Sequence, residues 1–143
     1  MSNYQEYIVR VYNRRTEYCN KEGKLHRTDG PAIEGSDGYK EYWVEGKHHR
    51  IDGPAIERRD GTKEYWVEDK RHRIDGPAIV CSDGYKAYYV EGNLHRTDGP
   101  AVVYSDGSKS YWVEGKELTE KEFNRLYGKA PCSGKTVTID GVE

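Results

Sequence analysis

Four histidines, each followed three residues later by an aspartate, have the residue types and spacing that could carry acid–base chemistry. The histidines are His26, His49, His72 and His95, and the aspartates are Asp29, Asp52, Asp75 and Asp98. An imidazole beside a carboxylate is the usual arrangement of a general base and the acid that orients it. A catalytic site needs one asymmetric constellation, whereas four identical copies at one spacing are typical of a structural requirement. We therefore expect no catalytic residue and interpret both sets as a structural turn lock.

The turn lock follows from what each residue type does around an Asp-Gly-Pro segment. Asp caps the turn through its own backbone, Pro fixes φ, and His and Arg contact carbonyl or carboxylate groups of the next hairpin. Metal binding is a weaker interpretation, because equivalent histidines in neighbouring copies lie about 9.5 Å apart, too far to share one ion. His48 and His49 are adjacent, but adjacent strand residues face opposite ways. The sequence therefore predicts no metal site and no cofactor.

Two other columns are candidates for binding. One consists of arginines, whose forked guanidinium suits phosphate or carboxylate groups: Arg27, Arg50, Arg73 and Arg96. Each stands two residues before an aspartate on the same strand face, so neutralisation by that Asp is the alternative interpretation. The other column is aromatic and comprises Trp43, Trp66, Tyr89 and Trp112. It is either part of the core or an exposed docking stripe, because an apolar patch of that kind usually marks an interface.

A repeat of 23 residues determines the elements that position these columns. Asp-Gly-Pro-Ala begins at Asp29, Asp52, Asp75 and Asp98, and a second Asp-Gly pair begins at Asp37, Asp60, Asp83 and Asp106. Asp-Gly between β-prone runs predicts a type I′ hairpin turn with Gly at positive φ. Glu45-Gly46 marks a second turn. In the next copy Asp69 replaces the glycine, and aspartate still tolerates the left-handed region. Two strands of roughly seven residues and two turns of about four fill the period.

The predicted fold class is all-β: an elongated antiparallel meander of stacked 23-residue β-hairpin repeats, with one short C-terminal capping helix. Side chains alternate between the two faces of a strand. Tyr42 and Val44 are therefore expected on one face, and Glu41, Trp43 and Glu45 on the other. A single layer this thin needs curvature, a cap or a partner to shield at least one aromatic row.

One repeat domain is expected over 1–143, with a cap at each end. Its parts are an N-terminal strand and half-repeat cap over 1–25, four repeats over 26–118, a capping helix over 119–128, and a C-terminal tail over 129–143 with a strand at 136–139. Thr119 and Glu122 form a capping box, and Gly128 is the expected C-terminal stop. The helix has an apolar stripe of Phe123, Leu126 and Tyr127. We expect that stripe to dock on the more apolar late repeats, at 80–81 and 102–104.

Composition excludes several classes of protein. The formal net charge is -2 with both signs interspersed, so no basic field exists to attract nucleic acid. The three cysteines are far apart and in no CxxC spacing, which argues against a disulfide framework and favours a reducing compartment. No signal layout and no apolar run of membrane-spanning length is present. We expect a cytoplasmic protein that contacts no membrane.

The unit Tyr-Trp-Val-Glu-Gly-Lys followed by His-Arg-x-Asp-Gly-Pro-Ala resembles the MORN repeat, in the divergent variant of bacterial antitoxin-like proteins and phage proteins. The resemblance covers residues 16 to 118. It implies an elongated single-layer sheet and a binding or scaffolding role, but no substrate. MORN units typically have Gly where this chain has Arg-x-Asp after the His, so the lipid binding proposed for the wider family is not carried over.

Two functions follow as hypotheses. The first is a non-enzymatic protein-interaction module, encoded by a phage or mobile element, that binds and inhibits or modulates a host protein such as a defence factor. The second is an oligomeric sponge whose clefts use Arg and aromatic residues to sequester a small anionic molecule such as a signalling nucleotide. An enzyme ranks last, because the chain lacks a nucleophile elbow, a phosphate-cradling Gly loop and metal-ligand spacing. Open sheet edges also favour a homodimer.

Overall fold

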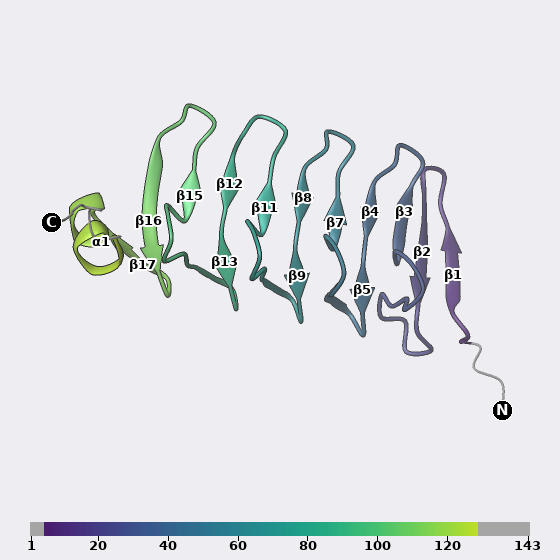
Figure 1. Cartoon of the computed structure of the whole chain (residues 1–143). Helices are drawn as coiled ribbons and strands as arrows, with labels where there is room; N and C mark the ends of the chain where they lie inside the picture. Colours follow the sequence, from purple (N-terminus) through teal and green to yellow (C-terminus); the bar gives the residue numbers. More distant parts are fainter. Residues whose placement is uncertain (1–4, 129–143) are drawn as a thin grey trace, which may run out of the picture.

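A computed structural model describes residues 5–128 and shows the predicted fold class, an all-β antiparallel meander with one short C-terminal helix (Figure 1). Eleven strands form the main sheet in the order in which they occur along the chain. They are β1 (Ile8–Val11), β2 (Arg15–Cys19), β3 (Ile33–Gly35), β4 (Lys40–Glu41), β7 (Ile56–Glu57), β8 (Lys63–Glu64), β11 (Ile79–Val80), β12 (Lys86–Ala87), β15 (Val102–Val103), β16 (Lys109–Val113) and β17 (Lys116–Leu118).

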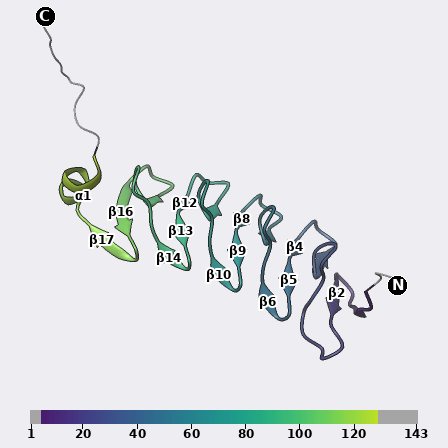
Figure 2. The same ribbon diagram turned by 60° about the horizontal axis from the view of Figure 1, so that its bottom comes forward.

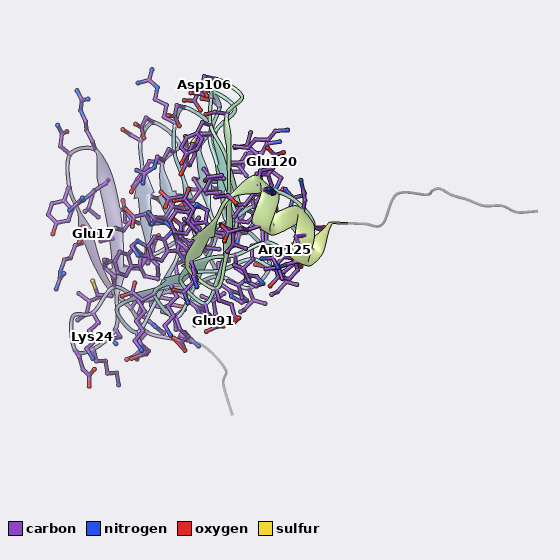
Figure 3. The ribbon with its side chains drawn as sticks, turned by 90° about the vertical axis from the view of Figure 1, so that its left-hand side faces the viewer. Glu17, Lys24, Glu91, Asp106, Glu120 and Arg125 are labelled. Carbon is purple, nitrogen blue, oxygen red and sulfur yellow. The ribbon has the colours of Figure 1, made fainter. Side chains whose placement is uncertain are left out.

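Three small hairpins continue the repeats beyond the main sheet and line up along one side of it (Figure 2). They pair β5 (Trp43–Val44) with β6 (Lys47–His48), β9 (Trp66–Val67) with β10 (Lys70–Arg71), and β13 (Tyr89–Val90) with β14 (Asn93–Leu94). Figure 3 views the molecule along the stack. The turns of the main sheet, marked by Asp106, lie at one end of each repeat, and the turns of the small hairpins, marked by Glu91, lie at the other end.

The predicted strands of roughly seven residues are wrong, because the chain changes its pairing partner in mid-strand. Lys40–Glu41 pairs with main-sheet strands on both sides, whereas Trp43–Val44 pairs only with Lys47–His48. Tyr42 lies at the junction, donating its N–H to Ala55 O at 2.7 Å while its own carbonyl accepts from His49 N at 3.0 Å. In the first three copies the long strand is thereby divided into two short ones, whereas in the last copy β16 runs unbroken over Lys109–Val113. The chain then returns to the main sheet through a non-strand loop, residues 49–55.

The Asp-Gly turns of the main sheet are not type I′, contrary to the prediction. Gly38 has φ 93°, whereas the φ of Asp37 is not positive. A type I′ turn requires a positive φ at both of its central residues. Gly38 N donates to Gly35 O at 3.2 Å, and Gly35 N donates to Tyr39 O at 2.7 Å. These bonds define a three-residue loop, a type I turn followed by a left-handed glycine. Asp37 Oδ1 accepts Tyr39 N at 3.1 Å, so the aspartate closes this turn with its side chain.

The turns of the small hairpins are the ones with type I′ character. Glu45 and Gly46 have φ 50° and 79°, and they join strand pairs with the two-residue loop that this turn closes. Asp69, which replaces the glycine in the next copy, has φ 66° and takes the left-handed conformation expected of it. Every copy therefore places a glutamate in a conformation that costs an L-residue about 1–2 kcal/mol. That cost indicates that other contacts hold these turns in place.

The core is a set of rows that run across the repeats. The alanine of each Asp-Gly-Pro-Ala segment has no exposed surface: these residues are Ala32, Ala55, Ala78 and Ala101. The residue after it is apolar and, in Ile33, Ile56 and Val102, at most 5% exposed. Side chains alternate as predicted, since Trp43 Nε1 donates to Glu41 Oε2 at 2.8 Å on one face. The same repeat positions therefore line the core in successive copies.

Both ends of the stack differ from the repeats. β1 is an edge strand with all four residues exposed. At the other end α1 (Glu120–Tyr127) begins with the predicted capping box of Thr119 and Glu122. Gly128 ends the helix as predicted but at φ -64°, outside the left-handed region.

Helix α1 packs mainly on β16 and β17, one hairpin further along than predicted, because a single residue joins it to β17. The Phe123 ring lies 4.8 Å from that of Tyr111 and is 4% exposed. Leu126, in the same predicted apolar stripe, is 55% exposed. The strand predicted at 136–139 lies outside the described residues.

Replacing the glutamate of one strained turn should stabilise the protein. Glu114 has φ 51° and precedes Gly115, so Glu114→Asn creates the Asn-Gly pair that type I′ turns favour. We expect the free energy of unfolding in urea to rise by about 0.5–1 kcal/mol, as strain at a non-Gly left-handed residue is relieved. Glu117→Asn, at an exposed strand residue, is the matched control and should give no gain. Equal effects of the two substitutions would show that the turn is not strained.

Candidate functional site

The four repeat histidines hold the strained turns of the following hairpins. Nδ1 of each ring accepts the backbone N–H of a glutamate 19 residues later, at 3.0, 3.1, 2.9 and 3.0 Å respectively: His26 with Glu45, His49 with Glu68, His72 with Glu91, and His95 with Glu114. A backbone N–H can only donate, so Nδ1 is the acceptor in each of these contacts. Acting as a base through Nδ1 would require each ring to give up this contact.

A second hydrogen bond links the same turns to the preceding copy. The N–H of the second turn residue donates to the carbonyl of the residue that precedes each repeat histidine: Gly46 to Leu25, Asp69 to His48, Gly92 to Arg71, and Gly115 to Leu94, at 2.8 to 2.9 Å. Each turn is thus attached at two consecutive backbone N–H groups to the copy before it. The register between neighbouring copies is fixed by these contacts.

The arginines lie flat in the loops between copies. Arg50 Nε donates to Asp52 Oδ1 at 3.1 Å and Nη1 to Pro54 O at 3.0 Å, while its Cζ lies 3.9 Å from the centroid of the Tyr42 ring. The other side of the guanidinium faces Gly53, where a Cβ atom would come within 2.9 Å of Cζ. The glycine of Asp-Gly-Pro is therefore needed for close approach. The same clamp occurs at Arg27, Arg73 and Arg96.

The arginine column is not uniform in charge. Arg27 and Arg50 each also bond a glutamate of the main sheet, Glu34 at 3.1 Å and Glu57 at 3.2 Å. Valine occupies the equivalent positions beside Arg73 and Arg96, so within residues 5–128 these two arginines lack the second carboxylate and keep the ion pair to the aspartate two residues later. Neutralisation by aspartate, the alternative interpretation of this column, is thus present in all four copies. Binding by the column stays a prediction.

Three hollows open between successive loops on the face that carries these arginines, here called the Arg face. Hollow 1 has a volume of about 450 Å³ and lies between residues 27–30 and residues 49–52, with Tyr42 and Val44 in its wall. Hollow 2 has a volume of about 640 Å³ and repeats this lining 23 residues later. Hollow 3 follows in turn between 73–76 and 95–98. Ile51 and Ile74 line these hollows and are each 76% exposed, although both are apolar.

The tryptophan column, on what we call the Trp face, is half-buried and is stacked with the residues opposite it. The Trp43 ring lies 3.7 Å from the ring of His48, which lies 5.1 Å from that of Trp66. Arg71 Cζ continues the stack, at 4.8 Å from Trp66 and 5.6 Å from Tyr89. Contacts along the column are therefore mainly internal, which favours a packing role, and its docking role stays a prediction.

Buried carboxylates lie under this column. Glu64 is 6% exposed and is bonded by Arg58 at 2.8 Å and Arg71 at 3.2 Å. Burial alone would raise the pKa of Glu64, but the two guanidinium groups outweigh it and lower that pKa. Trp66 Nε1, which is buried, has no hydrogen-bond partner among the described residues, because Glu64 is occupied by the two arginines.

Sequence reasoning missed the network around His48. Its Nε2 lies 2.8 Å from Glu41 Oε2, and the same carboxylate accepts from the Trp43 indole and from the Tyr39 hydroxyl. Burial and the hydrogen bond to Glu41 raise the pKa of Tyr39 to about 12. Burial alone would raise the pKa of Glu41, but its bonds to His48, Tyr39 and Trp43 lower it. The other copies have Leu or Arg at the position of His48, and this difference could have indicated the network. From the sequence alone, His48 is considered only as a metal ligand beside His49.

Searches for other kinds of site and for related proteins add no functional assignment. Within residues 5–128, no group of three or more His, Cys, Asp or Glu is arranged to hold a metal ion. No helix among these residues is long and apolar enough to cross a membrane. Comparison with protein-family models finds none that matches the chain, and comparison with curated proteins also finds no match. The MORN resemblance therefore rests on the repeat motif alone.

Removing one repeat histidine should weaken the junction between two copies. His72→Ala leaves Glu91 N, in a left-handed turn, without its acceptor, and we expect the free energy of unfolding to fall by about 1 kcal/mol. His72→Asn places an amide oxygen near the position of Nδ1 and should recover part of the loss. Urea unfolding measures both variants. If His72→Ala unfolds at the wild-type urea concentration, the histidine does not lock the turn.

Proposed function

We propose that this protein is a non-enzymatic interaction module that binds a partner protein through the hollows of its Arg face. The observation that carries the proposal is the row of hollows whose rims bear Ile51 and Ile74, each 76% exposed. Isolated apolar side chains on a surface are ordinary, but these two recur at one repeat position beside hollows with aromatic walls. Protein interfaces combine such apolar anchors with a polar rim.

The arginines beside these isoleucines strengthen the proposal. Each guanidinium is already fixed by its aspartate, a carbonyl and a tyrosine ring, so little side-chain entropy is lost when a partner contacts it. Arg and aromatic residues are also enriched among interface residues that contribute most to binding. By contrast, the carboxylates beneath the Trp face are occupied by contacts within the protein. The Arg face is therefore the better candidate surface.

The MORN resemblance extends the proposal to the kind of partner. Divergent repeats of this type occur in antitoxin-like and phage proteins, so we propose a host protein, such as a defence factor, that the chain inhibits or modulates in the host cytoplasm. This part of the proposal depends on the resemblance alone.

Partner capture from a bacterial lysate tests the proposed function and the face it uses. The immobilised protein should retain a stoichiometric partner, identified by mass spectrometry, and Ile74→Asp should reduce its recovery at least about tenfold, because a charge is placed on the apolar rim. Leu126→Asp changes a similarly apolar residue, 55% exposed on α1, and is the matched control. Trp66→Ala tests the opposite face. Absence of any stoichiometric partner, or equal recovery with Ile74→Asp, would count against the proposal.

The sponge for a small anionic molecule is the second candidate, and the charge of the later copies favours it. Arg73 and Arg96 lack the glutamate that bonds Arg27 and Arg50, so the later loops carry less negative charge. Calorimetry with a panel of nucleotides should then detect binding that Arg73→Gln weakens more than Arg50→Gln does. Uniformly silent titrations would exclude the sponge.

The expected homodimer has a candidate location at β1, which forms one edge of the main sheet within the described part of the chain. Ile8, Val9 and Val11 are 42%, 49% and 77% exposed on this strand, and an unpaired apolar edge favours pairing with another strand. Self-association remains a prediction.

A further inference from the structure

Tyr7 lies on the surface of the half-repeat that precedes hollow 1, in contact with Tyr18, His26 and Thr28. Tyr7 lies before the repeats, and its ring is 5.9 Å from that of Tyr18, at an interplanar angle of 85°, and 6.3 Å from that of His26. Its hydroxyl accepts the backbone N–H of Thr28 at 3.2 Å. Three oxygens can accept its own proton: Gln5 Oε1 at 3.0 Å, Thr28 Oγ1 at 3.2 Å and Asp29 Oδ1 at 3.4 Å. A phenol is thus held by two rings, one backbone N–H and a set of acceptors that includes the Asp29 carboxylate.

The same wall recurs in hollows 1 and 2. In hollow 1, Tyr42, His49, Ile51 and Asp52 stand where Tyr18, His26, Thr28 and Asp29 stand in the half-repeat. In hollow 2 the set is Tyr65, His72, Ile74 and Asp75. Within residues 5–128, the N–H groups of Ile51 and Ile74 have no hydrogen-bond acceptor, whereas that of Thr28 has the Tyr7 hydroxyl. Each hollow therefore presents to solvent the counterparts of Tyr18, His26, the Thr28 N–H and Asp29.

We propose that hollows 1 and 2 each bind a tyrosine side chain of a partner protein, in the way the half-repeat binds Tyr7. This inference rests on the proposed function and specifies the partner chemistry. Volumes of about 450 and 640 Å³ leave room for a phenol and the adjoining backbone. The tyrosine hydroxyl accepts the backbone N–H of Ile51 or Ile74 and donates to the carboxylate of Asp52 or Asp75. The tyrosine ring covers the exposed isoleucine side chain. Phenylalanine makes the ring contacts but neither hydrogen bond.

The spacing of the hollows specifies the conformation of the partner segment. Equivalent points in successive copies are two strands apart, about 9.5 Å. A polyproline II segment has three residues per turn and a rise of about 3.1 Å per residue, so residues i and i+3 lie about 9.3 Å apart on one side. In a β-strand, residues i and i+3 point to opposite sides. Tyrosines separated by two residues in a polyproline II segment therefore match both hollows.

Titration of the full-length ¹⁵N-labelled protein with short peptides tests this inference. The probe is an acetylated, amidated Tyr-Pro-Pro-Tyr peptide, and the control is Phe-Pro-Pro-Phe. We expect the tyrosine peptide to bind at least about tenfold more tightly, because two hydroxyl groups each add hydrogen bonds. Its addition should shift the amide signals of Ile51 and Ile74 more than that of Thr28, which lines hollow 1 but whose N–H is already bonded to Tyr7. Equal affinities, or shifts centred on the Trp face, would overturn the inference.

A variant of the built-in tyrosine provides the matched test. Tyr7→Ala vacates the wall in front of Thr28, so the tyrosine peptide should shift the Thr28 amide signal more than it does in the wild type. Tyr7→Phe keeps the ring over Tyr18 and should give a smaller Thr28 response. A Thr28 signal that never responds in Tyr7→Ala, while the remaining spectrum is unchanged, contradicts the inference. If a lysate partner depends on Ile74 but no tyrosine peptide binds, the proposed function stands and this inference fails.

Discussion

The clamp on each loop arginine is the interaction on which the rest of the structure depends. A guanidinium held between a tyrosine ring and a glycine backbone, and tied to an aspartate and a carbonyl, keeps the returning loop flat against the sheet. The next residue in the motif after proline is an alanine with no exposed surface, so the loop also closes the core row. The isoleucine between Arg and Asp is consequently turned outward. One contact pattern thus provides both the packing between copies and the outer surface of the hollows.

The two halves of the stack use the same backbone with different side chains. In the first two copies, Glu34 and Glu57 bond the loop arginines on the Arg face. Glu41 and Glu64 lie under the aromatic residues of the Trp face. In the later copies, Val80 and Val103 replace the first pair of glutamates, and Ala87 and Ser110 replace the second pair. The fold tolerates this exchange because register is fixed by backbone and histidine contacts common to all copies. Charge and apolarity can therefore vary along the stack without changing its geometry.

The sequence predicted the elements and the period well, because both follow from local turn chemistry and alternation. The capping box at Thr119 and the left-handed Asp69 were confirmed for that reason. The type I′ assignment at Asp37-Gly38 was wrong, because a dipeptide does not reveal how many residues a turn spans. Strand length was also overestimated, since the switch of partner at Tyr42 depends on the neighbouring copy. The His48 network and the Tyr7 contact were missed. Each involves a residue that does not recur with the 23-residue period, so the repeat pattern gave no indication of its contacts.

The direction of the contacts between copies has a consequence for how the chain is built. Each turn is held by a histidine ring and a carbonyl that precede it in the sequence, as in the attachment of Glu68 and Asp69 to His49 and His48. During synthesis, the N-terminal copy is complete before the next one leaves the ribosome, and it already presents the acceptors that the new turn requires. Assembly can then proceed from the N-terminal copy onward, each hairpin being positioned by the preceding one, with the helix following the last repeat.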